Sequence, residues 1–226
     1  KSDFINNMTH EFKTPIATIS LAVDSIKNPK VQNDKEKMEY FTRIIREENK
    51  RMNSQVENVL QMAQLEKGEL HLRKEQLNLH SIILNVVDLI DLRVQSKDGK
   101  IGRVLDATIP MTIGDPIHLS NVIFNLLDNA NKYSPEKPVI KISTYNNNEG
   151  LFVTVKDKGA GMSKETQKKI FEKFYRVPTG NIHRIKGFGL GLYYVKKIID
   201  LHQGFVTIES GQGKGTSVHI KLPVNT

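Results

Sequence analysis

The sequence predicts two parts with different folds: a hairpin of two long α-helices, followed by an α/β sandwich. In the first part, apolar residues recur every three or four positions, which is the spacing of one face of a helix. In the second part, helical stretches are interleaved with stretches of apolar and polar alternation, which is typical of strands. We expect the change of pattern near residues 67–72, with a hairpin over 1–67 and a sandwich over 68–226.

The composition excludes several classes of protein. Of the 226 residues, 38% are hydrophobic and 26% charged, which is too apolar for a disordered chain. No apolar run approaches the roughly 18 residues that span a bilayer. The sequence has no cysteine, which excludes a disulfide framework and a thiol nucleophile. The net charge of +8 favours anionic partners, but Lys and Arg are dispersed among Asp and Glu, so we expect a solvated surface and no nucleic-acid binding.

The two helices of the hairpin are defined by their apolar seams and their ends. Asn28-Pro29 ends the first helix, and Gly68 can cap the second. The helical spacing of apolar residues is already present at the start of the sequence, so we expect the chain to begin inside a helix, with a segment missing upstream. One hairpin buries one face of each helix, so we expect a homodimeric four-helix bundle. The expected seams are Ile5, Met8, Phe12, Ile16, Ile19, Val23 and Ile26, then Met38, Phe41, Ile45, Met52, Val56, Val59 and Ala63.

The second part contains helices and strands in a mixed order. We expect helices near residues 79–94, 116–133, 164–174 and 190–202, and strands near 139–145, 151–156, 205–209 and 216–222. Residues 146–150 form a hairpin turn. Strands paired as hairpins with helices on one face give the sandwich.

A histidine lies on the outer face of the first helix. His10 is two positions from both Met8 and Phe12, so it points about 200° away from the seam. Thr14 is one turn further on the same face, Glu11 is adjacent, and Pro15 would bend the helix. An exposed imidazole is mostly neutral at neutral pH and can be a nucleophile, while a carboxylate beside it can accept its proton. Taken alone, the pattern fits an ordinary surface histidine near a proline kink better.

Polar residues line one face of the expected helix at 116–133. Asn125, Asn129 and Lys132 are spaced by four and three residues, so they share a face. Amide oxygens with a lysine suit a hydrated Mg²⁺ ion and a phosphate. An exposed polar face is the alternative.

Three glycine-containing motifs follow strands or precede a helix. Asp157-Lys158-Gly159-Ala160-Gly161 follows a strand, where a carboxylate can accept from an exocyclic amine and glycines let a ligand approach the backbone. Gly187, Gly189 and Gly191 precede a helix, whose free amides bind anions. The segment 211–216 reads as a hairpin turn, and 171–176 as a helical, aromatic segment that packs in the core. Each motif is weak alone.

The ordered set closely resembles the kinase core of bacterial sensor histidine kinases over essentially the full chain. The matching motifs are His10-Glu11-Phe12-Lys13-Thr14-Pro15, Asn125 to Tyr133, Asp157-x-Gly159-x-Gly161, Phe171-x-x-Phe174-Tyr175-Arg176, glycines 187, 189 and 191, and Gly211-x-Gly213-x-Gly215-Thr216. The resemblance implies a dimerisation and phosphotransfer hairpin (1–67) and a GHKL-type ATP-binding sandwich (68–226), shared with type II topoisomerases and heat-shock chaperones. Phe12-Lys13, Ile16 and His118 depart from the commoner residues, without removing a reacting group.

The resemblance also implies roles for single residues. His10 would be the phosphoacceptor, Glu11 its base, and Thr14 would position water when a response regulator is dephosphorylated. Asn129 would coordinate Mg²⁺ with help from Asn125. Contacts to ATP would come from Lys132, Tyr133, Asp157, Gly159, Gly161, Lys186, Gly187, Gly189, Gly191 and Thr216, with residues from about 176 to 186 as a mobile lid.

The resemblance implies an ATP-dependent protein histidine kinase that passes the phosphoryl group to an aspartate of a receiver domain. It also implies a cytoplasmic fragment of a protein anchored in the inner membrane through segments upstream of Lys1. Two other functions stay open: a scaffold or phosphatase with a silent kinase step, and an ATPase clamp of the same superfamily.

Overall fold

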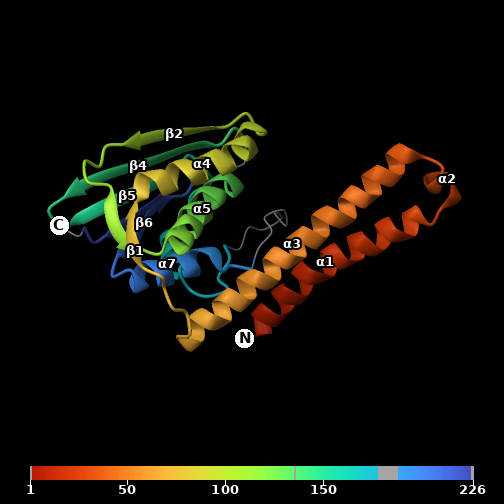
Figure 1. Cartoon of the computed structure of the whole chain (residues 1–226), viewed down its shortest axis with the longest axis horizontal. Helices are drawn as coiled ribbons and strands as arrows, with labels where there is room; N and C mark the ends of the chain where they lie inside the picture. The colour runs from red at the N-terminus through yellow and green to blue at the C-terminus, as the bar shows by residue number, and fades with distance from the viewer. Residues whose placement is uncertain (1, 135, 178–187, 225–226) are drawn as a thin grey trace. The chain divides into compact units, whose positions relative to one another are not determined.

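The computed structural model describes residues 2–134, 136–177 and 188–224 (Figure 1). Backbone contacts separate the chain up to Leu70 from the chain that begins at His71. The first part is a helical hairpin and the second an α/β unit, and each is described by itself.

The hairpin consists of α1 (Ser2–Ile26), the one-turn helix α2 (Pro29–Gln32) and α3 (Lys35–Lys67). Asn28 caps α2 by accepting a hydrogen bond from the amide of Lys30. Gly68 ends α3 with a φ of 68°, a conformation that costs glycine little. The predicted ends of both long helices are confirmed, whereas α2 was expected to be a plain turn.

The seam between α1 and α3 differs from the expected one. Pro15 and Ala22 on α1, with Gln55 and Met62 on α3, are buried. The predicted seam residues Ile16, Val23, Val56 and Ala63 are exposed. The other predicted seam residues with a described side chain are half-buried, so the periodicity was correct. At these four positions, however, the buried residue is the one that precedes the predicted residue.

The α/β unit is built on a five-stranded sheet among the described residues, with the order β2-β4-β5-β7-β6. The strands are β2 (Lys100–Leu105), β4 (Val139–Asn147), β5 (Gly150–Asp157), β6 (Phe205–Gly211) and β7 (Gly215–Leu222). β2 pairs in parallel with β4, and the other neighbours are antiparallel. A separate antiparallel pair joins β1 (Glu75–Asn78) to β3 (Met111–Gly114).

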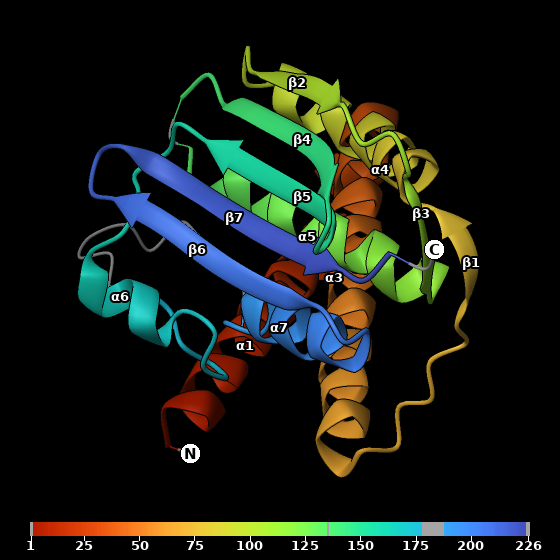
Figure 2. The ribbon, with the colours of Figure 1, turned by 90° about the vertical axis from the view of Figure 1, so that its left-hand side faces the viewer.

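Three helices cover one face of the sheet: α4 (Leu79–Gln95), α5 (Pro116–Lys132) and α7 (Gly191–Leu201), as Figure 2 shows. Asn78 caps α4 and Asp115 caps α5, each through a side-chain oxygen that accepts from two backbone amides. Between the helices and the sheet lies the core, whose fully buried side chains include Ile83, Leu127, Ile142, Ile198 and Ile220. This arrangement confirms the predicted sandwich.

Some elements differ from the sequence expectations. Helix α6 (Lys164–Lys169) stops earlier than expected, and residues 171–176 are not helical. Phe174 has a φ of 64°, which is incompatible with a continuing right-handed helix. Its ring is half-buried, with Lys173 Nζ 4.5 Å from the ring centroid, so this segment is not core. β1, β2 and β3 were not expected.

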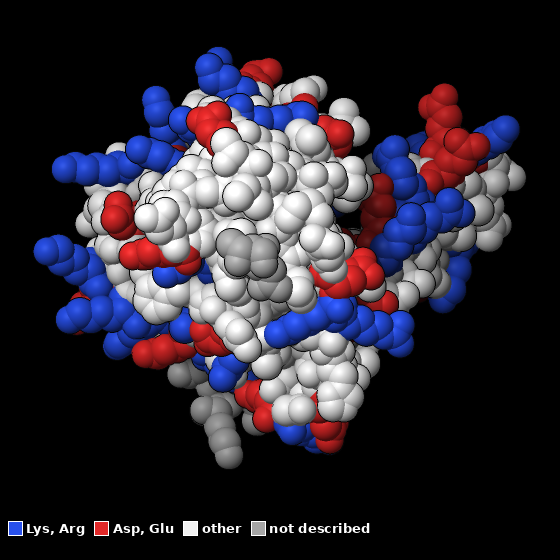
Figure 3. Space-filling model, turned by 60° about the vertical axis from the view of Figure 1, so that its left-hand side comes forward, with Lys and Arg blue, Asp and Glu red and all other residues white. Residues whose placement is uncertain are grey.

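The charged residues of both signs are mixed on the surface. On the face shown in Figure 3, Lys and Arg side chains are interspersed with Asp and Glu. In the described parts of the chain, no helix has both the length and the apolar character needed to cross a bilayer.

Candidate nucleotide and phosphoacceptor site

The segment His10 to Pro15, predicted from the sequence to carry the phosphoacceptor, lies within α1, but the side chain of His10 is outside the described residues. Glu11 faces α3, where its Oε2 accepts from Arg51 Nη2 at 3.4 Å and from Gln55 Nε2 at 3.5 Å. The side chains of Glu11 and Arg51 are 12% and 24% exposed, so this ion pair is partly shielded from water. Thr14 is exposed. Sequence reasoning missed Arg51 and Gln55, which lie 40 or more residues further along the chain.

Asp157 ends β5 with its carboxylate held by two backbone amides. Its Oδ1 accepts from the amide of Gly159 at 2.7 Å and from the amide of Thr216 at 3.1 Å. Its Oδ2 makes no hydrogen bond with the residues that the structure describes. Burial raises the pKa of Asp157, and the two amides oppose this rise. The carboxylate is therefore fixed in direction, with one oxygen left to accept a hydrogen bond from a ligand.

The glycines near Asp157 are required by contacts within the protein. A Cβ atom at Gly159 would lie 2.6 Å from the carbonyl oxygen of Tyr133, and one at Gly161 would overlap the carbonyl oxygen of Gly211. A Cβ at Gly215 would overlap the carbonyl oxygen of Asp157. The expected explanation, that Gly159 and Gly161 let a ligand approach, is therefore incomplete. These glycines allow the loop after β5 to pack backbone-to-backbone on α5 and on the β6–β7 turn.

The polar face of α5 presents an oxygen to the start of α7. Asn125 donates its Nδ2 to the carbonyl oxygen of Asn121 at 2.8 Å, so its Oδ1 is left as an acceptor. A Cβ on Gly191 would lie 2.9 Å from that Oδ1 and 3.8 Å from Asn129 Nδ2. The structure thus brings Asn125, Asn129 and Gly191 close together. The sequence predicted a shared face for the two asparagines, but it did not predict their proximity to Gly191.

Lys132 and Tyr133 have local partners at the end of α5. The Nζ of Lys132 pairs with the carboxylate of Asp128 one turn earlier, and Lys132 remains exposed. Burial raises the pKa of Tyr133, and the charge of Arg176 opposes this rise. The carbonyl oxygen of Tyr133 accepts from the amide of Ala160 at 3.1 Å. Tyr133 therefore anchors the loop after Asp157 through its backbone.

The first turn of α7 has amides available for an anion. Leu190 precedes the helix, and its side chain makes no capping hydrogen bond. Gly189 has a φ of 70°, and its carbonyl oxygen accepts from the amide of Phe174 at 3.1 Å. A helix N-terminus without a side-chain cap has orphan N–H groups and a partial positive charge. Lys186 and Gly187, also predicted to contact phosphates, lie outside the described residues.

A buried polar cluster stabilises the end of the unit behind α5 and α7. His118 Nδ1 lies 2.7 Å from the hydroxyl of Tyr194, whose pKa is raised to about 12 mainly by burial. His202 Nε2 accepts from the amide of Asp115 at 2.9 Å. His118, which the sequence only marked as a departure, is therefore a packing residue of this cluster.

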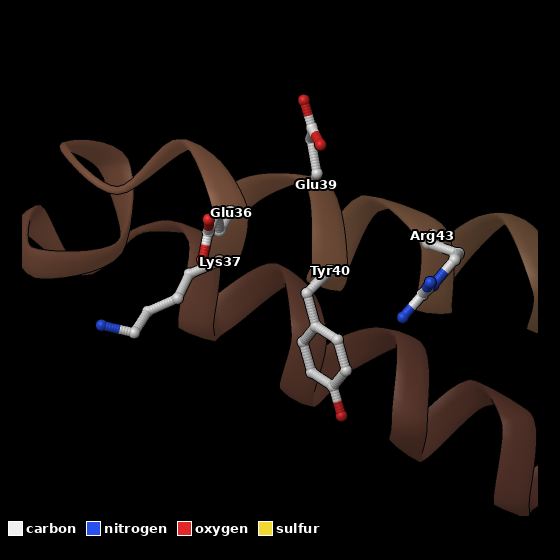
Figure 4. Close-up of a pocket in the computed structure, with 5 residues that line it drawn as sticks. All are labelled: Glu36, Lys37, Glu39, Tyr40 and Arg43. Carbon is white, nitrogen blue, oxygen red and sulfur yellow. The ribbon is translucent and has the colours of Figure 1, made fainter.

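A surface hollow lies elsewhere, on the hairpin. It has a volume of about 520 Å³ and is lined by Glu36, Lys37, Glu39, Tyr40 and Arg43 (Figure 4). All five residues are in α3 near its start, and the guanidinium carbon of Arg43 lies 5.8 Å from the Tyr40 ring centroid. None of the predicted site residues lines it.

Two family models match the chain. Residues 114–226 match the histidine kinase-, DNA gyrase B- and HSP90-like ATPase model, and residues 1–68 match the His kinase A (phospho-acceptor) domain. The chain belongs to the sensor histidine kinases and is a catalytic core of that family.

Individual proteins agree with this assignment. The chain is 46% identical to the sensor protein RprX of Bacteroides fragilis in an alignment of 226 positions, which covers 99% of the chain and 44% of RprX. It is 28% identical to the sensor histidine kinase WalK of Bacillus subtilis, covering 99% of the chain and 36% of WalK. The full-length ShkA structure, in complex with AMPPNP, has a similar fold, with a TM-score of 0.73, 23% identity, and coverage of 100% of this chain and 46% of ShkA. The chain thus spans less than half the length of these relatives.

Proposed function

We propose that this chain catalyses ATP-dependent phosphorylation of His10 and then passes the phosphoryl group to an aspartate in the receiver domain of a response regulator. The hairpin, residues 1–67, would carry the phosphoacceptor, and residues 68–226 would bind the nucleotide. The observation that carries the proposal is the first turn of α7, which lacks a side-chain cap and lies beside Asn125 and Asn129. A triphosphate with a metal ion needs hydrogen-bond donors for its phosphate oxygens and oxygen ligands for the metal.

The nucleotide would be held at both ends of this site. Asp157 would accept a hydrogen bond from the exocyclic amine of adenine, and Thr216 would lie beside it. The phosphates would meet the amides of α7 after Gly189 and Gly191, together with Lys186, Gly187, Lys132 and Tyr133.

A Mg²⁺ ion fits the donor set on α5. Asn125 has its Oδ1 left over as an acceptor, and Asn129 lies one turn further along the same face. Asn129 would coordinate the ion and Asn125 would assist, with water molecules completing the shell. When bound, Mg²⁺ supplies positive charge that neutralises the phosphate oxygens.

The chemical step requires positioning and one proton acceptor. An imidazole nitrogen of His10 forms a bond to the γ-phosphorus while the bond to the bridging oxygen breaks and ADP leaves. The carboxylate of Glu11 would accept the proton that the ring loses. Arg51 and Gln55 hold that carboxylate from α3, which supports a fixed orientation for the base. The phosphoryl group then passes to the aspartate of the regulator.

The hairpin would dimerise, and the longer protein would be anchored in the inner membrane with this core in the cytoplasm. The exposed side chains of Ile16, Val23 and Val56 support a second hairpin as the neighbour. Exposed Thr14, one turn after His10, also supports dephosphorylation of the regulator, with Thr14 positioning a water molecule.

The test is incubation with γ-labelled ATP and Mg²⁺. We expect a label on the chain that is lost in acid and kept in alkali, as a phosphohistidine is. The His10→Ala variant is expected to lose the label completely and still bind ATP, and the His71→Ala variant, which replaces an exposed histidine of the α/β unit, should keep the label. A labelled His10→Ala protein would contradict the assignment, and release of phosphate without any phosphoprotein would favour the ATPase clamp.

A further inference from the structure

Three side chains lie next to one another on the helix-facing side of the sheet, one on each of three adjacent strands. Asp157 is on β5, Thr216 on β7 and Ser210 on β6. Ser210 pairs with Thr216 in the β6–β7 register, and the amide of Thr216 donates to Asp157. Buried Val155, Val206 and Val218 lie on the same side of the sheet, because side chains alternate along a strand. Thr216 therefore lies between Asp157 and Ser210 on the same side of the sheet.

The Ser210 hydroxyl uses its proton and one of its two lone pairs in hydrogen bonds with the backbone. Its Oγ donates to the carbonyl oxygen of Gly215 at 2.8 Å, and this carbonyl can only accept. It accepts from the amide of Met162, also at 2.8 Å. A hydroxyl has one proton and two lone pairs, so one lone pair remains. Thr216 Oγ1 lies 3.0 Å away.

This arrangement fixes the direction of the Thr216 proton. Because the single proton of Ser210 is already donated to Gly215, the contact between the two hydroxyls is a hydrogen bond only if Thr216 donates. Thr216 then has two lone pairs and no proton for a ligand. The Thr216 hydroxyl and Oδ2 of Asp157 can therefore only accept hydrogen bonds from a ligand.

We propose that Ser210 is a specificity-determining positioning residue, which orients the Thr216 hydroxyl as an acceptor and so favours a 6-aminopurine over a 6-oxopurine nucleotide. The inference rests on the proposed function, since it concerns the base of the bound nucleotide. The amine of a 6-aminopurine has two protons to donate, whereas the oxygen of a 6-oxopurine would face acceptors. When two acceptors face each other, neither makes a hydrogen bond, and burying such unpaired groups costs free energy. This cost disfavours the 6-oxopurine.

The structure also supplies a matched control. Gln167, on α6, donates its Nε2 to the backbone carbonyl oxygens of Ser210 at 2.8 Å and of Met162 at 3.1 Å. It anchors the same strand end without any hydrogen bond to the hydroxyl of Ser210 or Thr216. A general loosening of this region would follow from its removal, but the Thr216 proton would keep its direction.

The experiment compares equilibrium binding of ATP and inosine triphosphate, which differ only at the 6-position and the N1 proton of the base. In the full chain, Ser210→Ala frees the Thr216 proton to turn toward the ligand. The dissociation constant of inosine triphosphate divided by that of ATP is the measure of base preference. This ratio should fall by about threefold to tenfold, which is the effect of one neutral hydrogen bond. Ser210→Thr retains the hydroxyl and should restore the ratio, and Gln167→Ala should lower thermal stability and leave the ratio unchanged.

A double-mutant cycle shows whether Ser210 acts through Thr216. Thr216→Val should lower the ratio by itself, and adding Ser210→Ala should then change nothing further. An unchanged ratio in Ser210→Ala, or an equal effect of Ser210→Ala with and without the Thr216 hydroxyl, would overturn the proposal and leave the kinase function intact. If neither nucleotide binds the unaltered chain, the proposed function itself fails.

Discussion

The hairpin and the α/β unit differ in how completely each one buries its own apolar side chains. Among the residues whose side chains the structure describes, the largest ones that are less than 2% exposed all lie in the α/β unit, between Leu79 and Leu222. The hairpin buries Ala22 and Met62, whereas Leu21 and Leu60 are 70% and 58% exposed. A single copy of the α/β unit therefore has a closed core, but a single hairpin does not. The comparison supports the proposed dimerisation through the hairpin, and the following predictions test it.

The largest expected effect tests this dimerisation directly. Leu60→Asp places a charge on the exposed apolar flank of α3, and symmetry places it twice in a dimer interface. We expect the dimer dissociation constant to rise at least about a hundredfold, measured by analytical ultracentrifugation, because an unpaired buried charge is costly. Leu89→Asp, on an exposed position of α4 in the α/β unit, should leave dimerisation unchanged. Equal dissociation constants for Leu60→Asp and the unaltered chain would contradict the comparison.

The second prediction affects only the α/β unit. Asp157→Asn retains an oxygen that can accept from the amides of Gly159 and Thr216, so the fold should persist. It removes the charge of the acceptor proposed for the adenine amine, so ATP should bind about tenfold to a hundredfold more weakly. Calorimetry measures the affinity, with Asp88→Asn as the control at an exposed carboxylate on α4. Unchanged affinity would mean that the base is recognised elsewhere.

The third prediction affects only the hairpin. Arg51→Ala removes the ion pair that holds Glu11, so phosphorylation of His10 should slow by about tenfold while ATP affinity stays the same. Arg51→Lys should recover part of the rate, since a charge returns. Arg43→Ala, also on α3, is the matched control. A lower ATP affinity in Arg51→Ala would argue against a role in positioning Glu11.

The smallest effect concerns the pH dependence of stability in the α/β unit. Burial lowers the pKa of His202, which lies near Asp115, His118 and Lys74. The unfolded chain binds a proton there below about pH 6.5. Its contribution is therefore complete above this pH and decreases as the pH falls toward the lower pKa of the folded protein. We expect the free energy of unfolding to decrease over this range as the pH falls.

His202→Gln provides the check, because a glutamine oxygen can still accept from the amide of Asp115. Chemical denaturation at pH 7.5 and 5.5 should show a smaller loss of stability for His202→Gln than for the unaltered chain. His71→Gln, at an exposed position, should behave like the unaltered chain. His80, whose pKa is also lowered by burial, accounts for a remaining pH dependence.

The sequence predicted the elements with long regular patterns and missed those defined by distant partners. α4, α5, α7 and four strands were found within about two residues at each end. β2 was missed because it contains Gly102 and is a strand only through its parallel pairing with β4. Residues 171–176 were predicted to be helical, because a phenylalanine in the sequence gives no indication that its φ is positive, as it is at Phe174.

The same distinction applies to the site. Asp157 and the asparagines of α5 could be proposed as site residues from the sequence because their motifs are local. Ser210 was missed because its role depends on its pairing with Thr216 across the β6–β7 turn. The alternation of Val206, Ile208 and Ser210 was a usable signal, since it puts Ser210 on the buried side of its strand.

The close packing at Gly161 and Gly215 has a consequence for how this region tolerates change. A single methyl group at either position would overlap a carbonyl oxygen of the facing backbone. Random substitution at these two codons should therefore yield folded, nucleotide-binding clones only when glycine is retained, whereas Gly213, with open space around it, needs glycine only for its positive φ. Asparagine tolerates a positive φ, so it distinguishes the two kinds of position in a saturation library. Asparagine should be accepted at Gly213 and should prevent folding at Gly161 and Gly215.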